Sequence, residues 1–93
     1  MDIKILGCRS PQRFVVKRVV QSALDDLRRE YPDLKVKISE IKDYREIEQY
    51  TPILIYPSLV INQKLCCNGR FPSRIEAKNW LKEMLDEEST NVS

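Results

Sequence analysis

Four stretches of the chain have the apolar and polar pattern of β-strands. In residues 2–6 and 34–39, apolar side chains alternate with charged or polar ones, and the first stretch ends at a glycine. Residues 58–61 are almost entirely apolar, and residues 64–67 follow them after Asn62-Gln63. Asn at the first position of a two-residue connection favours a tight hairpin turn. The pattern therefore predicts four short strands, of which the last two form a hairpin.

Three segments have the spacing of amphipathic helices. From Pro11 to about Arg29, one apolar stripe recurs every three or four residues: Val16, Val20, Ala23, Leu24 and Leu27. Ser10 is predicted to be the N-cap of this helix and Pro11 its first helical residue. Residues 42–50 predict a short charged helix. Ser73 and Glu76 have the spacing of a capping box, and they open a last helix with these expected inward residues: Ile75, Ala77, Leu81, Met84 and Leu85.

The order of these elements is strand, helix, strand, helix, strand, strand, helix. A strand–helix–strand start implies a parallel pair with a right-handed crossover, and the final hairpin adds an antiparallel pair. The sequence therefore predicts an α/β fold with a four-stranded mixed β-sheet flanked by three helices. We expect one domain over residues 1–86 and a polar, frayed C-terminal tail over residues 87–93.

Composition excludes several kinds of chemistry. The 93 residues include no His, which rules out Ser-His-Asp and Cys-His catalysis as well as zinc sites that use His. A net charge of +2 argues against a dedicated nucleic-acid binder. No apolar run is long enough to span a membrane, and the polar start of the chain does not look like a secretory signal. We therefore expect a cytoplasmic protein whose three cysteines rest as thiols.

The element order, the strand-to-helix turn at residues 7–11 and the proline that opens the third strand resemble the thioredoxin fold. More narrowly, residues 2–85 resemble the small, glutaredoxin-sized redox-disulfide proteins of bacteria and archaea. Residues 56–62 fit the strand that this family opens with Thr-Pro, and Asn68-Gly69-Arg70 fits the approach to its last helix. The resemblance implies thiol–disulfide chemistry without a cofactor. It also implies a cis peptide bond at Pro57, beside a groove for an extended, thiol-bearing partner.

The catalytic motif of that family is degenerate in this chain. An ungapped match puts Ser10 and Arg13 where the two active cysteines belong, with Pro11 and Gln12 between them. Cys8 lies two residues too early, and moving it into register would turn the helix by about 200°. The usual mechanism needs an attacking thiolate and a second thiol about one helical turn on. Since the second thiol is missing in either alignment, we expect standard dithiol activity to be absent or weak.

The three cysteines leave several interpretations open. Cys8 precedes a helix N-terminus and is followed by Arg9, so it is either a reactive thiol or an ordinary loop thiol. Cys66 and Cys67 point to opposite faces of one strand, where they either pack or react. The fourth strand should lie about 10 Å from the first, so a bridge to Cys8 would require the loop to move. A vicinal disulfide and a soft-metal site of three thiolates are further alternatives, although we assign no metal.

The predicted binding residues are expected near the same edge of the sheet as Cys8. Arginines 9, 13, 70 and 74 are expected near the first helix's N-terminus, where they would form a pocket for a carboxylate, a phosphate or a glutathione-like anion; an ordinary solvated face is the alternative. The candidate binding residues are Arg9, Ser10, Arg13, Tyr56, Pro57, Gly69 and Arg70.

Two main functions remain open at this point, and the oligomeric state is not predicted. One is a degenerate thiol–disulfide oxidoreductase that uses Cys8, with or without Cys66 or Cys67. The alternative is a non-catalytic module whose proline-edged groove binds a peptide or a small anion. A thiolate site for a soft metal or metalloid is a third possibility.

Overall fold

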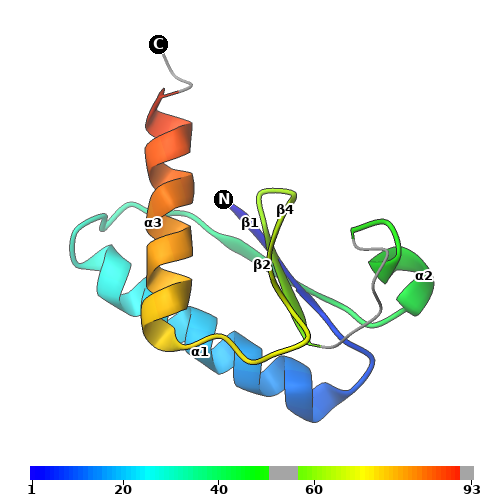
Figure 1. Cartoon of the computed structure of the whole chain (residues 1–93). Coiled ribbons are helices and arrows are strands. Elements are labelled where there is room, and N and C mark those ends of the chain that lie inside the picture. The colour runs from blue at the N-terminus through cyan, green and yellow to red at the C-terminus, as the bar shows by residue number, and fades with distance from the viewer. Residues whose placement is uncertain (51–56, 91–93) are drawn as a thin grey trace.

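The computed structural model describes residues 1–50 and 57–90 of the chain, with side chains up to residue 88. Figure 1 shows the arrangement of its elements. In chain order these are β1 (Asp2–Leu6), α1 (Ser10–Arg28), β2 (Lys37–Ile41), α2 (Tyr44–Ile47), β3 (Ser58–Ile61), β4 (Lys64–Asn68) and α3 (Arg74–Thr90).

The strands form one mixed sheet in the order β2-β1-β3-β4. β1 is parallel to β2 and antiparallel to β3, and β3 is antiparallel to β4. At one end of the sheet Leu6 lies opposite Ser58, which in turn lies opposite Asn68. The predicted four-stranded α/β fold with three helices is therefore confirmed. The same register places the turn after β1 and the end of β4 at the same end of the sheet.

The main core lies between the sheet and the pair α1 and α3. Ile3 and Ile5 of β1 and Leu59 and Ile61 of β3 are fully buried in it. Their neighbours Leu6 and Val60 belong to a smaller core with Ile47 of α2. Successive strand residues point to opposite faces, so α1 and α3 cover one face and α2 covers part of the other (Figure 1).

The start of α1 differs from the prediction by one residue. Arg9, with φ −103° and ψ 126°, is the N-cap, and no side chain caps the helix there. The amide of Arg13 donates to the Arg9 carbonyl oxygen at 3.3 Å, which makes Ser10 the first helical residue. The prediction of Ser10 as N-cap is therefore wrong, and Pro11 occupies the second helical position instead of the first.

The strand predicted from residue 34 begins three residues later, at Lys37. The amide of Leu34 donates to the carbonyl oxygen of Tyr31 at 3.1 Å, so Leu34 closes a turn after α1. Pairing between β2 and the N-terminal strand begins at Lys37, whose amide donates to the Met1 carbonyl oxygen at 3.0 Å. The following helix, α2, has only four residues, and its N-cap Asp43 accepts from the Arg45 amide at 2.9 Å.

The predicted capping box at the start of α3 is present. The Ser73 amide donates to Glu76 Oε1 at 3.1 Å, and the Glu76 amide donates to Ser73 Oγ at 3.1 Å. Ala77, Leu81 and Met84 are buried as expected. Ile75 is 73% exposed, so its predicted inward orientation is wrong.

α3 continues to Thr90, into the segment that was expected to be a frayed tail. Glu88, on this additional length, accepts a hydrogen bond from Asn62 Nδ2 at 2.7 Å. Because Asn62 belongs to the β3–β4 turn, this bond ties the end of the helix to the sheet. None of the described helices combines the length and hydropathy that a membrane-crossing segment requires.

Candidate functional site

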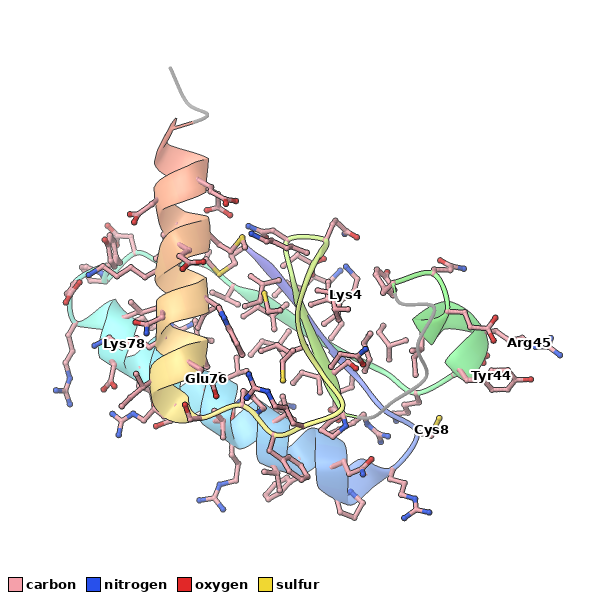
Figure 2. The ribbon with its side chains drawn as sticks, viewed as in Figure 1. Lys4, Cys8, Tyr44, Arg45, Glu76 and Lys78 are labelled. Carbon is pink, nitrogen blue, oxygen red and sulfur yellow. The ribbon has the colours of Figure 1, made fainter. Side chains whose placement is uncertain are left out.

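The turn between β1 and α1 carries the thiol nearest to the family's catalytic position. The Gly7 amide donates to the carbonyl oxygen of Ile41 at 3.1 Å, which anchors the turn to β2. Cys8 follows and is exposed as a free thiol. Figure 2 shows its side chain at the tip of this turn, outside the packed core. Other molecules therefore have direct access to the Cys8 sulfur.

Arg13 points inward from the first turn of α1. Its Nη1 donates to the Gly7 carbonyl oxygen at 2.8 Å, and its Nε donates to Glu40 Oε1 at 3.1 Å. The residue is only 5% exposed. The position that the family pattern gives to a second cysteine is thus occupied by a guanidinium that holds the turn and pairs with β2. Arg13 is not available to bind an external anion, which corrects its assignment as a binding residue.

Cys66 and Cys67 both pack against the main core, because a register irregularity in the pairing of β3 with β4 interrupts the alternation of side chains at this point. The prediction that the two point to opposite faces is therefore wrong. Cys67 is 4% exposed and its Sγ donates to the carbonyl oxygen of Arg70 at 3.2 Å. Cys66 is half-buried, with its Sγ 3.5 Å from the carbonyl oxygen of Lys64. Burial raises the pKa of both thiols. Both are therefore poor sources of thiolate at neutral pH compared with an exposed cysteine.

The three thiols do not form one site. All three cysteines are free, so neither a vicinal disulfide nor a bridge to Cys8 is present. Cys8 follows the end of β1 and Cys67 lies near the end of β4, with β3 between the two strands. This separation corresponds to about 10 Å, beyond the Cα distance that a disulfide spans. Among the described residues, no group of three Cys, Asp or Glu side chains is close enough to hold a metal ion.

The residues predicted to edge a groove at Pro57 are only partly within the described part of the chain. Pro57 is buried, and its carbonyl oxygen accepts from the Gly69 amide at 2.9 Å. Gly69 has φ 80°, a left-handed conformation that suits glycine. These two residues therefore join the start of β3 to the end of β4. Tyr56 lies outside the described residues, as does its peptide bond to Pro57, so the cis bond stays a prediction.

The predicted pocket of four arginines is not formed. Arg70 makes a two-pronged pair with Glu76, at 2.9 and 2.6 Å, and its guanidinium lies 5.9 Å from the ring centre of Trp80. Arg74 makes a similar pair with Asp26, at 2.6 and 3.0 Å. Two of the four arginines thus pair with carboxylates of different helices, and Arg13 is buried against β2. Arg9 is exposed at the N-cap, next to the first helical residue, Ser10.

These ion pairs shift the pKa values of two acids, Glu76 and Asp26. The hydrogen bonds from Arg70 lower the pKa of Glu76 to about 2, and those from Arg74 lower the pKa of Asp26. Glu76 was recognised only as part of the capping box. Asp26 and Glu40 had no sequence signal, because their arginine partners come from other elements of the fold.

Two comparisons find similarity to known proteins. A family model described as a thioredoxin domain matches residues 1–82. The structure is similar to that of E. coli glutaredoxin, with 17% sequence identity, 92% of this chain and 99% of the other chain covered, and a TM-score of 0.48. No curated protein matches the sequence significantly.

Proposed function

The chain belongs to the thioredoxin-domain family, and on that premise we propose that it performs thiol–disulfide exchange through the single thiol of Cys8. The proposal rests on the difference in exposure between Cys8 and Arg13, which lie on either side of the start of α1. Cys8 is exposed, whereas the residue in the second catalytic position, Arg13, is buried and hydrogen-bonded. Standard two-thiol activity is therefore expected to be absent or weak.

The reaction needs a thiol from outside the chain. The Cys8 thiolate attacks one sulfur of a substrate disulfide, forming a mixed disulfide and releasing the other substrate sulfur as a thiolate. A low-molecular-weight thiol, in its thiolate form, then attacks the substrate sulfur of that mixed disulfide. This second exchange releases the Cys8 thiolate and leaves the substrate joined to the small thiol. Each step breaks one S–S bond and forms another.

The surroundings of Cys8 support this assignment over the other two cysteines. Negative charge is favoured at a helix N-terminus, and the first turn of α1 contains no acidic residue. Cys8 directly precedes the N-cap residue of this helix, Arg9. Cys66 and Cys67, by contrast, have raised pKa values because of burial. Exchange at Cys8 therefore requires no opening of the core.

Glutathione disulfide provides a direct test. After incubation with it, intact-mass analysis and peptide mapping should find one glutathione adduct, located at Cys8. Cys8→Ser should lose the adduct, whereas the matched variant Cys66→Ser should keep it. A Cys8 that stays unmodified would contradict the proposal and favour the non-catalytic binding module. Loss of two thiols to an internal bridge would instead show a two-thiol protein and would also contradict it.

A further inference from the structure

A second surface lies between α1 and the start of α3, and it has no role in the proposed thiol chemistry. We call it the α1–α3 surface and define it by Val15, Val19 and Ile75, with Arg18, Arg74 and Lys78 around them. Val15 is 42% exposed and Ile75 is 73% exposed. Exposed apolar side chains that gather around a hollow are typical of interaction sites.

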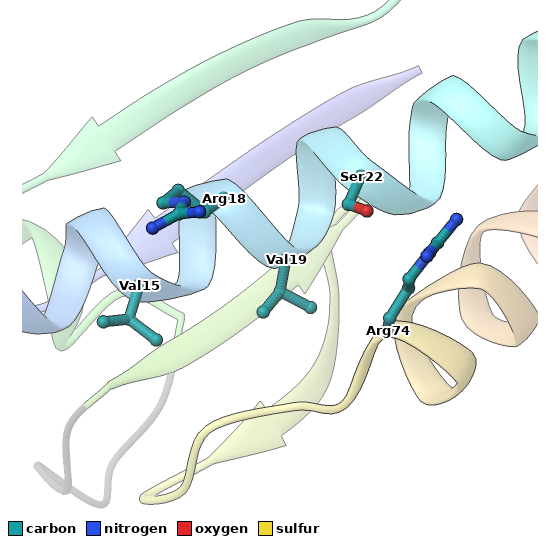
Figure 3. A pocket seen from close by; sticks show the side chains of 5 residues that line it. All are labelled: Val15, Arg18, Val19, Ser22 and Arg74. Atoms are coloured by element: carbon teal, nitrogen blue, oxygen red, sulfur yellow. The ribbon is translucent and has the colours of Figure 1, made fainter.

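Two adjacent hollows form this surface. The first, of about 280 Å³, is lined by Val15 and Val19 of α1 and by Arg74 of α3. Figure 3 shows both valines on the side of α1 that faces the segment entering α3, with Arg74 across from Ser22. The second hollow, of about 440 Å³, also has Arg74 in its lining, together with Ile75, Lys78 and the carboxylate of Asp26. One arginine side chain thus separates two apolar recesses.

The charges around the hollows have one predominant sign. Arg74 is neutralised by its pair with Asp26. Lys78 lines the same hollow as Asp26 and, after Arg74, helps to lower the pKa of that carboxyl. The Arg18 guanidinium forms no ion pair with the described acids and lies 5.9 Å from the ring centre of Phe14. Phe14 is itself 59% exposed. The surface therefore places three cations, Arg18, Arg74 and Lys78, beside the recesses against the single carboxylate of Asp26, and its net charge is positive.

We propose that the α1–α3 surface binds an acidic, amphipathic segment of a partner protein. Apolar side chains of that segment occupy the two hollows, on either side of Arg74. Its carboxylates pair with Arg18 and Lys78. Two open recesses separated by a side chain suit successive residues of a peptide, whereas small-molecule sites usually enclose most of their ligand in one cavity.

The charge pattern also argues against two other occupants. In a symmetric dimer through this face, the same cations of two copies would meet, and like charges oppose such pairing. An anionic bilayer would satisfy the cations, but it fits a convex apolar face that inserts between lipids. Val15, Val19 and Ile75 line recesses here instead of forming a convex face.

The test uses the full chain and three fluorescent peptides of equal length. They carry the same pattern of Leu and Phe, with Glu, Gln or Lys at every polar position. Fluorescence anisotropy should show the Glu peptide binding about tenfold more tightly than the Lys peptide, with a difference that falls as salt rises. Arg18→Glu, Lys78→Glu and Ile75→Ser should each weaken binding of the Glu peptide by about fivefold or more.

Matched controls come from α2, which lies away from this surface in Figure 2. Arg45→Glu and Tyr44→Ser change exposed residues of the same types and should leave binding unchanged, as should Cys8→Ser. Circular dichroism verifies that each variant is folded. Equal binding of the three peptides, or equal effects of surface and control variants, would overturn the proposal. Two further outcomes would overturn it if none of the peptides binds. One is self-association of the chain that Ile75→Ser abolishes, and the other is binding to phosphatidylserine vesicles that the same variant abolishes.

Discussion

The carbonyl oxygen of Gly7 accepts a hydrogen bond from Nη1 of Arg13 at 2.8 Å. This bond joins the residue before Cys8 to the residue in the family's second cysteine position. An ideal Cβ on Gly7 would lie 3.5 Å from Cγ of Arg13, so the side chain packs directly along the turn. At the position where the sequence alignment predicts a second cysteine, a larger polar side chain therefore holds the turn.

Removal of this side chain should destabilise the fold. Arg13→Ala leaves the Gly7 carbonyl oxygen without its donor and Glu40 without its closest partner. The expected loss is about 1–3 kcal/mol in the free energy of unfolding, the usual range for a buried polar group left unpaired. Urea denaturation measures it. Arg18→Ala, at an exposed position of the same helix, should change stability by no more than about 0.5 kcal/mol.

Cysteines introduced at the two positions of the predicted alignment should create two-thiol chemistry. In the double variant Ser10→Cys/Arg13→Cys, the thiols lie three residues apart at the start of α1, the spacing that lets the second resolve a mixed disulfide. We expect an internal disulfide by mass analysis and about a tenfold gain in insulin reduction by dithiothreitol. Ser10→Cys alone is the control and should show neither. A double variant that folds but forms no internal disulfide would contradict the ungapped alignment.

The fold could be predicted from the sequence because its elements have strong local patterns. The stripe from Val16 to Leu27 predicts α1, and the near-continuous apolar run at β3 predicts a buried strand. The start of β2 could not be placed this way. Leu34 and Val36 have strand-like alternation, yet Leu34 closes a turn by bonding to Tyr31. Alternation alone does not show where pairing with a neighbouring strand begins.

The candidate site was less predictable, because it depends on contacts between distant elements. Four arginines near one edge looked like an anion pocket, but the fold supplies acidic partners to three of them. Glu40 reaches Arg13 only because the register of β1 and β2 sets Glu40 opposite Ile5. That register cannot be inferred from the arginine positions. The exposure of Cys8, by contrast, follows from its place between a strand and a helix.

The pair between Arg70 and Glu76 predicts a dependence of stability on acid. The folded-state pKa of Glu76 is lowered from 4.5 to about 2, so its contribution is present above the unfolded-state pKa and is lost as the pH falls from about 4.5 to 2. Urea denaturation across this range should show that Glu76→Gln or Arg70→Ala makes the decline less steep. A slope unchanged in both variants would contradict this role. Some decline should remain because Arg74 also lowers the pKa of Asp26.

The β3–β4 turn offers a change that should stabilise the protein. Asn62 and Gln63 have φ values of 50° and 71°, the left-handed region that costs a non-glycine residue roughly 1–2 kcal/mol. Gln63 is exposed at the tip of the turn. Gln63→Gly creates the Asn-Gly pair that such two-residue hairpins prefer. We expect an increase of about 1 kcal/mol in the free energy of unfolding, measured by urea denaturation.

Asn62→Gly is the matched variant and should have the opposite effect. It relieves a similar backbone conformation, but it removes two contacts of the Asn62 side chain. Its Oδ1 accepts from the Asp2 amide at 2.8 Å, and its Nδ2 donates to Glu88 at 2.7 Å. Each such bond contributes about 1 kcal/mol, so their loss outweighs the relief. If both variants were stabilising, the bonds from Asn62 to β1 and α3 would contribute little to the fold.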